Sequence, residues 1–516
     1  MNCSCIHDTP RGYGIGPGPG ARVDTGTLSP GHFTRSVLLL IWLALALPVA
    51  AAQPRNFILL LSDDHRHDFM SFRTNAPSWL ETPNLDRLAR GGAHLANAFV
   101  STSLCSPSRA SLLTGRYMHH HRVVDNQRPE PPDIVFFPEH LQRAGYQTAF
   151  LGKWHMGHDS DEPRKGFHHW AAFRGQGDYL GMTLNVNGTR RKLGGYSADV
   201  LTDQALAWLK ENGSKPFYLQ LAYKSVHFPF EPAPRHRGRY ADKPVKYPAT
   251  MANTESNYAT QPRWVRERRY SIHGVDHMET GRFDDDPVPN FEAFYRSYCE
   301  TLYSLDENIG RLLDELERSR LATNTLVVYM GDNGFALGEH GFYDKRDAFE
   351  TSIRVPLLAW APGCIAPGTV ITQMVQNIDL APTLLEAAGV PVPADAPRFD
   401  GRSFWPWLLG RTVSWRDHIL YEYHWEWNFP ATPSTFAIRT ERYKFIYYHG
   451  VWDQNSFYDL ATDPGERHNL FSVPAFQEQI AALQKQLFDE LEISGGLNIP
   501  VRRPAGEALP ERKLAR

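Results

Sequence analysis

Two pairs of adjacent polar residues follow short apolar runs of this sequence, and all four residues offer oxygen atoms. The pairs are Asp63-Asp64 and Asp332-Asn333, and neither pair contains Cys or His. Carboxylate and amide oxygens are the ligands that Ca²⁺ and Mg²⁺ prefer, whereas zinc prefers imidazole or thiolate. The two pairs together therefore predict a site for Ca²⁺, with Mg²⁺ as the alternative. Asp63-Asp64 alone is also typical of a capped turn after a strand.

Lysines and histidines follow two further apolar runs. Lys153 and His155 lie in the stretch Gly-Lys-Trp-His, and His227 ends the stretch Lys-Ser-Val-His. In open α/β sheets, ligands bind beyond the carboxyl ends of the strands. We therefore expect these basic side chains to converge with the two acidic pairs. A single lysine or histidine is more often a surface or structural residue, but four strand ends together favour a catalytic site.

Cys105 begins the segment Cys-Ser-Pro-Ser-Arg-Ala-Ser-Leu-Leu-Thr-Gly. Pro107 near its start and Gly115 after its end predict one short helix. This helix places Cys105 at its N-terminus, where free N–H groups favour an anion, and Arg109 one turn later points the same way. A thiolate there would be activated. The flanking residues, however, do not indicate the Cys-His-Asn arrangement of a thiol hydrolase.

Apolar runs alternate with amphipathic segments along most of the chain. This alternation predicts an α/β fold with a large mixed, mostly parallel sheet sandwiched by helices. The continuous apolar runs predict buried strands, and the segments with helical spacing predict helices that cover them. The expected strands are residues 56–62, 146–151, 217–223, 325–330 and 355–360, and the expected helices lie around 201–209, 298–312 and 379–388.

The pattern changes near Trp415 to aromatic strands at 418–423 and 436–448, followed by an amphipathic helix. This change predicts a smaller C-terminal α+β subdomain. The polar stretch 232–289 predicts a surface insertion near the mouth of the site. The predicted organisation is a leader and signal peptide at 1–52, a catalytic domain at 53–410, the C-terminal subdomain at 411–495 and a tail at 496–516.

The charge balance and the N-terminus bear on partners and location. The 516 residues carry 54 Lys and Arg against 57 Asp and Glu, so the net charge of −3 gives no overall attraction to nucleic acid.

The N-terminal segment resembles a signal peptide, with Arg35 before the apolar run 37–50 and small residues after it. This pattern predicts cleavage near Ala52, and hence a secreted or periplasmic protein. The run is shorter than the about 20 residues of a membrane span. We therefore expect no stable membrane insertion, with an uncleaved anchor as the alternative.

The cysteines do not form a disulfide framework. Cleavage near Ala52 would leave three of the five, namely Cys105, Cys299 and Cys364. Cys299 and Cys364 either pair with each other or remain free thiols.

The segment Cys-x-Pro-Ser-Arg followed by Ala-Ser-x-Leu-Thr-Gly resembles the signature of the type I, formylglycine-dependent sulfatases. These enzymes are relatives of alkaline phosphatase. The resemblance runs from about Asn56 to Leu491 and implies an alkaline phosphatase-like fold. The other family motifs stand in order, at Asp63-Asp64, Gly152-Lys153-x-His155, His227, Gly331-Asp332-Asn333-Gly334 and Lys345.

The resemblance implies that a formylglycine-generating enzyme oxidises Cys105 to formylglycine (3-oxoalanine). One hydroxyl of the aldehyde hydrate then attacks sulfur, and the second allows sulfate to be expelled. His155 is the implied base for that expulsion, and His227 the implied acid for the leaving oxygen. The implied catalytic residues are Cys105, Arg109, Lys153, His155, His227 and Lys345. The implied metal ligands are Asp63, Asp64, Cys105, Asp332 and Asn333.

The stretches 117–126 and 421–430 resemble the N-acetylglucosamine-6-sulfatase and mucin-desulfating branch. This implies a carbohydrate sulfate ester as substrate, with hexosamine 6-sulfate in glycosaminoglycan or mucin glycans as the leading candidate. His424, Trp425 and Glu426 are the implied substrate-binding residues, although the same aromatic run is also typical of packing between two subdomains.

Several other functions stay open at this point. A sulfatase acting on algal polysaccharide or aryl sulfates, and a phosphate or phosphonate monoester hydrolase of the same superfamily, would share the motifs. A secreted thiol hydrolase would need Cys105 unmodified. A non-catalytic glycan-binding relative is disfavoured because Cys105, Arg109 and the acidic pairs are all intact.

Overall fold

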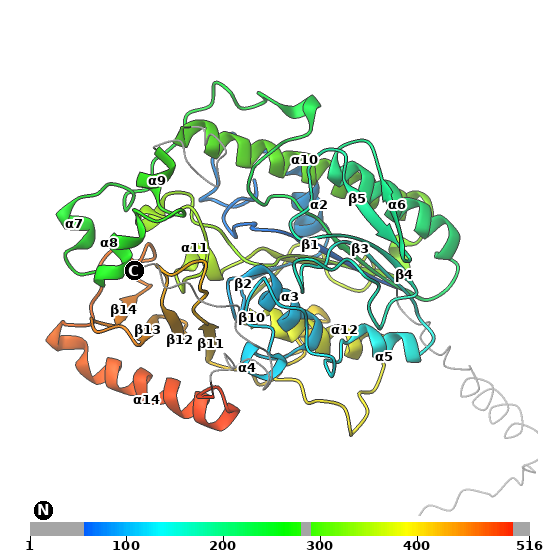
Figure 1. Cartoon of the computed structure of the whole chain (residues 1–516). Coiled ribbons are helices and arrows are strands. Elements are labelled where there is room, and N and C mark those ends of the chain that lie inside the picture. The colour runs from blue at the N-terminus through cyan, green and yellow to red at the C-terminus, as the bar shows by residue number, and fades with distance from the viewer. Residues whose placement is uncertain (1–55, 280–289, 499–516) are drawn as a thin grey trace, which may run out of the picture. The chain divides into compact units, whose positions relative to one another are not determined.

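The strands at the centre of the fold come from continuous apolar runs of the sequence. The structure, a computed structural model, describes residues 56–279 and 290–498. A ten-stranded mixed sheet forms its centre (Figure 1). The strand order is β10 (Thr369–Gln376), β2 (Ala93–Phe99), β9 (Leu357–Trp360), β8 (Thr325–Gly331), β1 (Asn56–Ser62), β7 (Phe217–Ala222), β3 (Gln147–Lys153), β4 (His169–Phe173), β5 (Thr183–Val186) and β6 (Thr189–Lys192).

The helices cover this sheet and connect its strands. The predicted helices around 201–209, 298–312 and 379–388 are present, although the second is much longer than its apolar stripe. The helices are α2 (Pro83–Gly91), α3 (Cys105–Thr114), α4 (Met118–His121), α5 (Pro138–Arg143), α6 (Ser197–Asn212), α7 (Glu255–Tyr258), α8 (Arg263–Arg268), α9 (Val275–Glu279), α10 (Phe291–Arg318), α11 (Glu350–Ile353), α12 (Leu380–Ala388), α13 (Trp405–Leu408) and α14 (Gln477–Ser494).

Both faces of the large sheet are buried, and β1 shows how. Phe57 and Leu59 pack into a core that also contains residues of α3 and α12. Ile58 and Leu60 point to the opposite face and pack with residues of α6 and α10. Because helices cover both faces, a central strand needs apolar residues at every position rather than at alternate ones.

Strand direction also follows the prediction. Strands β8, β1, β7, β3 and β4 form one parallel block. Strand β9 pairs antiparallel with both β8 and β2, and β5 is antiparallel to β4 and β6. The predicted α/β class, with a mixed and mostly parallel central sheet between helices, is confirmed.

A second sheet follows in the C-terminal part of the chain. It contains four antiparallel strands, β11 (His418–Tyr423), β12 (Ser434–Thr440), β13 (Tyr443–His449) and β14 (Ser456–Asp459). Leu420 and Phe436 on one face pack against Leu487 of α14, whereas Tyr421 on the other face belongs to a core of the large sheet. Both sheets belong to the same compact unit. The predicted domain boundaries stay a prediction.

Several elements differ from the sequence-based expectation. The single strand expected at 436–448 is wrong, because the chain turns after Thr440 and pairs β12 with β13. Strands β2, β4, β5, β6, β10 and β14 were not expected. The sequence of β6, Thr-Arg-Arg-Lys, is exposed at all four positions and carries no apolar signal.

The stretch 232–289 is only partly a surface insertion. Within its described part, Arg268 and Arg269 of the α8 region are 1% and 3% exposed. Arg268 lies 2.8 Å from Asp344 and 3.1 Å from Asp347, so this segment packs into the body of the protein through buried ion pairs.

Two further expectations concern cysteines and membranes. Cys299 and Cys364 are free thiols, so the alternative in which they form a disulfide is wrong. The signal-peptide prediction for residues 1–52 lies outside the described residues. In the described ranges 56–279 and 290–498, no helix combines the length and the apolar character needed to cross a membrane.

A buried ionic cluster joins the second sheet to the large one. The Nζ of Lys444 on β13 lies 2.8 Å from Oε1 of Glu350 on α11 and 2.7 Å from Oε1 of Glu466. The Lys444 side chain is fully buried, and both carboxylates are at least nine-tenths buried. Buried charges are tolerated only when they are paired. Arg439 Nε also lies 3.1 Å from Glu350 Oε1, so Lys444 is the partner that the two buried carboxylates share rather than the sole partner of Glu350.

We predict that Lys444→Met lowers the free energy of unfolding by about 3–5 kcal/mol, because it leaves two buried carboxylates without their shared partner. Urea denaturation measures the change. Lys485→Met is the matched control, since the Lys485 side chain is 75% exposed, and it should change stability by no more than about 0.5 kcal/mol. Equal stability of the two variants would contradict the role assigned to Lys444.

Candidate active site

The parallel block of the large sheet brings the predicted residues to one edge. Asp63 follows the last residue of β1, and Asp332 follows the last residue of β8. Lys153 is the last residue of β3, and His227 lies shortly after β7. Because these four strands are parallel neighbours, their carboxyl ends meet at the same edge, as the sequence analysis expected.

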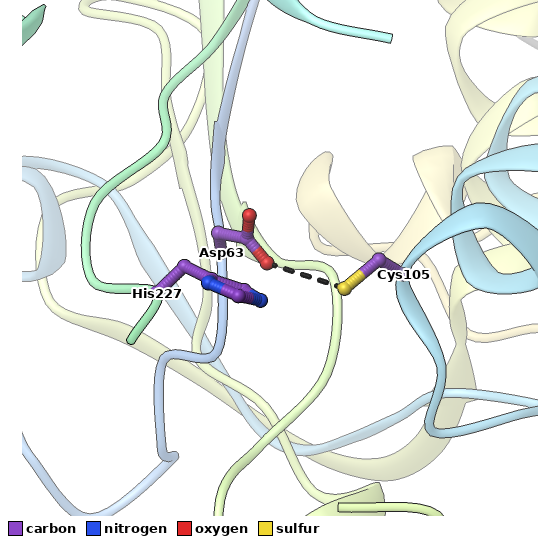
Figure 2. A group of neighbouring side chains, drawn as sticks. All are labelled: Asp63, Cys105 and His227. Carbon is purple, nitrogen blue, oxygen red and sulfur yellow. Dashed lines mark hydrogen bonds between the residues drawn. The ribbon is translucent and has the colours of Figure 1, made fainter. Parts of the chain in front are cut away.

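Cys105 reaches this edge from the start of α3. Its Sγ lies 3.5 Å from Asp63 Oδ1, 3.2 Å from Lys345 Nζ and 3.8 Å from Lys153 Nζ. Figure 2 shows Cys105 joined to Asp63 across the site, with the ring of His227 beside the carboxylate. The Leu104 position offers no side-chain cap to the helix, and Asn126 Oδ1 instead accepts the Ser106 N–H at 3.0 Å.

Three carboxylates and one amide form the acidic half of the site. Oxygen atoms of Asp63, Asp64 and Asp332 lie within 4.8 Å of one another. Asp64 Oδ2 and Asn333 Oδ1 are buried without a hydrogen-bond partner among the described residues. His227 Nε2 is 3.8 Å from Asp64 Oδ2, beyond hydrogen-bond distance.

Burial and the close spacing of these carboxylates shift their pKa values. Burial raises the pKa of Asp64 to about 7, against the opposing effect of Lys345, and the neighbouring charges of Asp63 and Asp332 raise it further. Such a cluster gains from a cation. Closely spaced oxygen donors with two unpartnered atoms are a donor set that fits Ca²⁺ or Mg²⁺.

Three basic side chains form the other half of the site. Arg109 Nε donates to Asp332 Oδ2 at 2.9 Å, and its Nη2 lies 2.8 Å from the same oxygen. Lys153 pairs with Asp63, and Lys345 pairs with Asp64. By formal charge, the three cations balance the three carboxylates.

Pairing across the site controls the charge states. Burial alone would raise the pKa of Asp63, but Lys153, His227 and Arg109 hold it well below its ordinary value. Burial alone would lower the pKa of Lys345, but Asp64 raises it above its ordinary value. Both groups therefore remain charged at neutral pH.

The shifted pKa values of the Cys105 thiol and the His155 ring favour their neutral forms instead. Burial raises the pKa of Cys105 to about 12, and the Asp63 carboxylate adds to this shift. Burial and the nearby Lys153 charge lower the pKa of His155 well below its ordinary value. Both are neutral at pH 7, and a neutral thiol is a weak nucleophile, which argues against a thiol hydrolase.

A cavity of about 310 Å³ opens onto the site. His227 and Lys345 line its inner end. The rest of its wall consists of polar and aromatic side chains from several segments of the chain. The lining residues are Asp64, Asn126, Gln176, Gly177, Lys224, His227, Phe228, Pro229, His273, Phe294, Phe335, Tyr343, Asp344, Lys345, Arg346 and Phe429.

Arg346 organises one wall of this cavity. Its Nη1 donates to Asp344 at 2.7 Å, and its Nε donates to Glu426 at 2.8 Å. The guanidinium carbon lies 3.7 Å from the centre of the Phe429 ring. The His273 ring stacks on Phe429, with 4.6 Å between the ring centres, and its Nδ1 lies 2.9 Å from the Asp344 carboxylate.

The three residues implied to bind substrate do not line the cavity. His424 is 1% exposed, and burial lowers its pKa to about 4. Glu426 lies behind Arg346 and also accepts a hydrogen bond from the Tyr423 hydroxyl at 3.0 Å. Trp425 is 45% exposed and lines a different hollow. Of the three, only Glu426 is linked to the cavity, through Arg346.

Sequence reasoning missed several cavity residues. Asp344 and Arg346 flank Lys345 directly, so their position beside an identified residue was an available signal. His273 lies in the stretch that was expected to be a surface insertion. Gln176, whose Oε1 accepts a hydrogen bond from Lys153, follows the unexpected strand β4 and carried no signal.

Comparison with known proteins assigns this site to a family. Residues 55–390 match the family model described as Sulfatase, and residues 338–492 match the model described as N-sulphoglucosamine sulphohydrolase, C-terminal. The chain therefore belongs to the sulfatase family, within the alkaline phosphatase superfamily. The prediction of a sulfuric ester hydrolase is confirmed.

Individual relatives agree with this assignment. The chain is 33% identical to the N-acetylglucosamine-6-O-sulfatase of Bacteroides thetaiotaomicron, covering 89% of this chain and 90% of the relative. It is 31% identical to the N-acetylglucosamine-6-sulfatase of Homo sapiens, covering 73% and 69% of the two chains. A solved structure of a protein in complex with its substrate D-glucosamine-2-N,6-O-disulfate aligns with a TM-score of 0.79 at 29% identity, over 87% of this chain and 100% of the other.

A more distant structure shows the shared fold alone. The phosphonate monoester hydrolase of Silicibacter pomeroyi aligns with a TM-score of 0.71 at 23% identity, over 85% of this chain and 96% of that enzyme.

We predict that Ca²⁺ or Mg²⁺ raises the melting temperature of chelator-treated protein and that Asp64→Asn removes most of this effect. A cation at 100 times its Kd would stabilise the native state by about 2.7 kcal/mol. Asn at position 64 removes one negative charge and one unpartnered oxygen. Asp314→Asn is the control, because its side chain is 73% exposed. A wild-type melting temperature that neither cation changes would contradict a hard-cation site.

Proposed function

We propose that this protein hydrolyses sulfate esters of carbohydrates, with a hexosamine 6-sulfate of glycosaminoglycan or mucin glycans as substrate. One observation carries the proposal: Lys345, whose Nζ lies 3.2 Å from Cys105 Sγ, lines a cavity of about 310 Å³ with a polar and aromatic wall. This volume is at the lower end of ligand pockets, which suits one sugar unit. Two relatives named above are N-acetylglucosamine-6-sulfatases, and the solved complex contains a glucosamine disulfate.

The charge balance supports an anionic ester at the inner end of the cavity. We propose that Asp63, Asp64, Asp332 and Asn333 hold a Ca²⁺ or Mg²⁺ ion, with residue 105 as a further ligand. Three carboxylates and three basic side chains balance formally, so a divalent ion makes the site net positive. A bound ion of this kind stabilises negative charge that develops on the sulfate oxygens.

We infer that residue 105 works as formylglycine, produced from Cys105 by a formylglycine-generating enzyme that reads the Cys-x-Pro-x-Arg sequence. The aldehyde hydrate offers one hydroxyl that attacks sulfur and a second whose deprotonation allows sulfate to leave. Serine at this position offers the first hydroxyl only. The helix N-terminus and the side chains of Lys153 and Lys345 surround residue 105 with positive charge, which suits an oxyanion there.

The chain's own side chains position the ester and move protons. Lys345 lies both at Cys105 and in the cavity, so it is placed to bind the sulfate. Arg109 fixes Asp332 and donates to the Lys153 backbone carbonyl at 2.6 Å, which keeps the cluster rigid. His155, held neutral, is suited to accept the proton of the second hydroxyl.

His227 is placed to assist the leaving group. Its ring lines the cavity, and burial with the Lys153 charge lowers its pKa well below the ordinary value. A sugar alkoxide is a poor leaving group, and protonation by a positioned acid typically contributes about 10²–10⁴-fold. The same shift leaves the free ring neutral at pH 7, so His227 acts as this acid only after it takes up a proton when the anionic ester binds.

The wall at Arg346 gives a physical basis for sugar selectivity. Asp344 offers hydrogen-bond acceptors and Arg346 offers donors, both fixed by their mutual ion pair. Phe429 and His273 add a flat surface. A fixed donor and acceptor discriminate between sugar hydroxyl positions, because an unpaired polar group would remain after the wrong sugar binds.

We predict that Cys105→Ser supports no sustained sulfatase turnover, because the serine ester lacks the second hydroxyl. Steady-state assays on an aryl sulfate, followed beyond one equivalent of product, test this. In the wild-type protein, peptide mass spectrometry should find residue 105 as the aldehyde. Ser106→Ala serves as the neighbouring control and should keep the modification. Repeated turnover by Cys105→Ser at the wild-type rate would sink the formylglycine proposal.

We also predict that hexosamine 6-sulfates are hydrolysed faster than the matched phosphate or phosphonate monoesters.

The variant Arg346→Lys tests the role of the cavity wall, because it keeps a positive charge for Asp344 and Glu426 but loses the planar guanidinium. It should lower kcat/KM for the sugar sulfate by about 5- to 150-fold, the loss of a contact of about 1–3 kcal/mol, while an aryl sulfate changes little. Arg190→Lys is the surface control. Equal losses on both substrates would place Arg346 outside sugar recognition.

A further inference from the structure

Exposed tryptophans gather in one part of the sequence. Among the described residues, Trp425, Trp427 and Trp452 are the tryptophans with large exposed side chains, at 45%, 72% and 102%. Tyr270, at 62%, is exposed as well. Large apolar surface that remains in contact with water commonly marks a binding site.

Two hollows lie beside these aromatic residues. The first, of about 360 Å³, is lined by Trp425, Pro430 and Val451 together with the α8 residue Glu267. The second, of about 390 Å³, is lined by Tyr270 and Asp453 and shares Glu267 with the first. Both hollows therefore adjoin Glu267 of α8, and Trp452 lies in the chain between Val451 of the first and Asp453 of the second.

The structure holds this surface in place. The Trp425 N–H donates to Ser434 Oγ at 2.8 Å, and its indole N–H donates to the Pro430 carbonyl at 3.3 Å. The turn that carries Trp452 is fixed to the segment before α8, where the Gln454 side chain donates to the Thr260 carbonyl at 2.8 Å. The exposed rings thus stand on ordered segments rather than on a loose loop.

One loop contributes to both the catalytic cavity and the first hollow. Phe429 lines the cavity, and the next residue, Pro430, lines the first hollow beside Trp425. A ligand chain that extended from the cavity across this loop would reach the hollow beside Trp425.

The chemistry of the surface fits a sulfated glycan. Indole and phenol rings bury the C–H face of a sugar while their polar ends stay hydrated. Arg263 and Arg266 line the second hollow and form exposed ion pairs, with Glu267 and Glu255 respectively. Arg266 also donates to Asn253 Oδ1 at 3.1 Å. Such exposed pairs are weak, so the guanidinium groups can exchange a carboxylate for a sulfate group.

We propose that Trp425, Trp452 and Tyr270 form an aromatic platform that binds the sugar units of a sulfated glycan chain beyond the unit in the catalytic cavity. This inference rests on the proposed carbohydrate sulfatase function. The platform raises the local concentration of chain ends at the cavity, because the second contact of a tethered ligand is intramolecular. It therefore favours polymeric over monomeric substrate.

Native electrophoresis in gels that contain heparin tests the platform directly, with Cys105→Ala protein as the background so that the glycan is not consumed. Trp452→Ala and Tyr270→Ala should each weaken retardation by about 3- to 10-fold. Trp452 is fully exposed, so its removal should not affect folding. Ile493→Ala, at an 82% exposed position on α14, is the matched control and should migrate like the background protein.

Kinetics with the intact Cys105 protein separate this inference from the proposed function. Trp452→Ala should keep the kcat/KM of a hexosamine 6-sulfate monosaccharide and lower that of a sulfated oligosaccharide by about 3- to 10-fold. Unchanged retardation and unchanged oligosaccharide kinetics would overturn the platform but leave the function standing. A wild-type enzyme inactive on every sugar sulfate would instead overturn the function. Sedimentation that shows a wild-type dimer dissociated by Trp452→Ala would also overturn the platform, since a second copy would then be the occupant.

Discussion

Compensation of buried charge at the edge of the large sheet is the constraint on which the rest of this structure depends. Asp63, Asp64 and Asp332 are at most 1% exposed, and unpaired carboxylates in such surroundings would cost several kcal/mol each. Their partners come from distant parts of the sequence, because Arg109 belongs to α3, Lys153 to β3 and Lys345 to the segment after β8. The strand order and the position of α3 are what bring these charges within contact.

The second sheet extends this constraint to the catalytic helix. On β11, the Tyr421 hydroxyl lies 2.6 Å from Ser103 Oγ, and the Glu422 N–H donates to the Ser101 carbonyl at 2.9 Å. These contacts hold the segment that leads directly into α3. The loop after β11 supplies Glu426, which fixes Arg346 at the cavity wall. One small sheet thus supports both the segment that leads into α3 and the Arg346 wall of the cavity.

The meeting of Asp63, Lys153 and Asp332 at one edge of the sheet could be predicted from sequence, because a buried parallel strand has a recognisable apolar pattern and its carboxyl end has a fixed place in the sheet. Substrate contacts had no such rule. The position of Trp425 depends on how the loop after β11 turns, and neighbours in that loop face different hollows. Edge strands such as β6 were not predicted, because their side chains face solvent and their sequence therefore carries no apolar pattern. The hairpin of β12 and β13 was read as one strand because both halves are aromatic across a short turn.

The complete burial of residue 105 has a consequence for how active enzyme arises. If a second enzyme must oxidise this cysteine, it needs the side chain in its own active site, and the packed α3 denies that access. Modification must then come before α3 docks onto the sheet, so the two events compete in time. The active fraction is set by relative rates, and a chain that folds first is stable but permanently inert. A sequence change that accelerates folding would, on this argument, lower the yield of working enzyme.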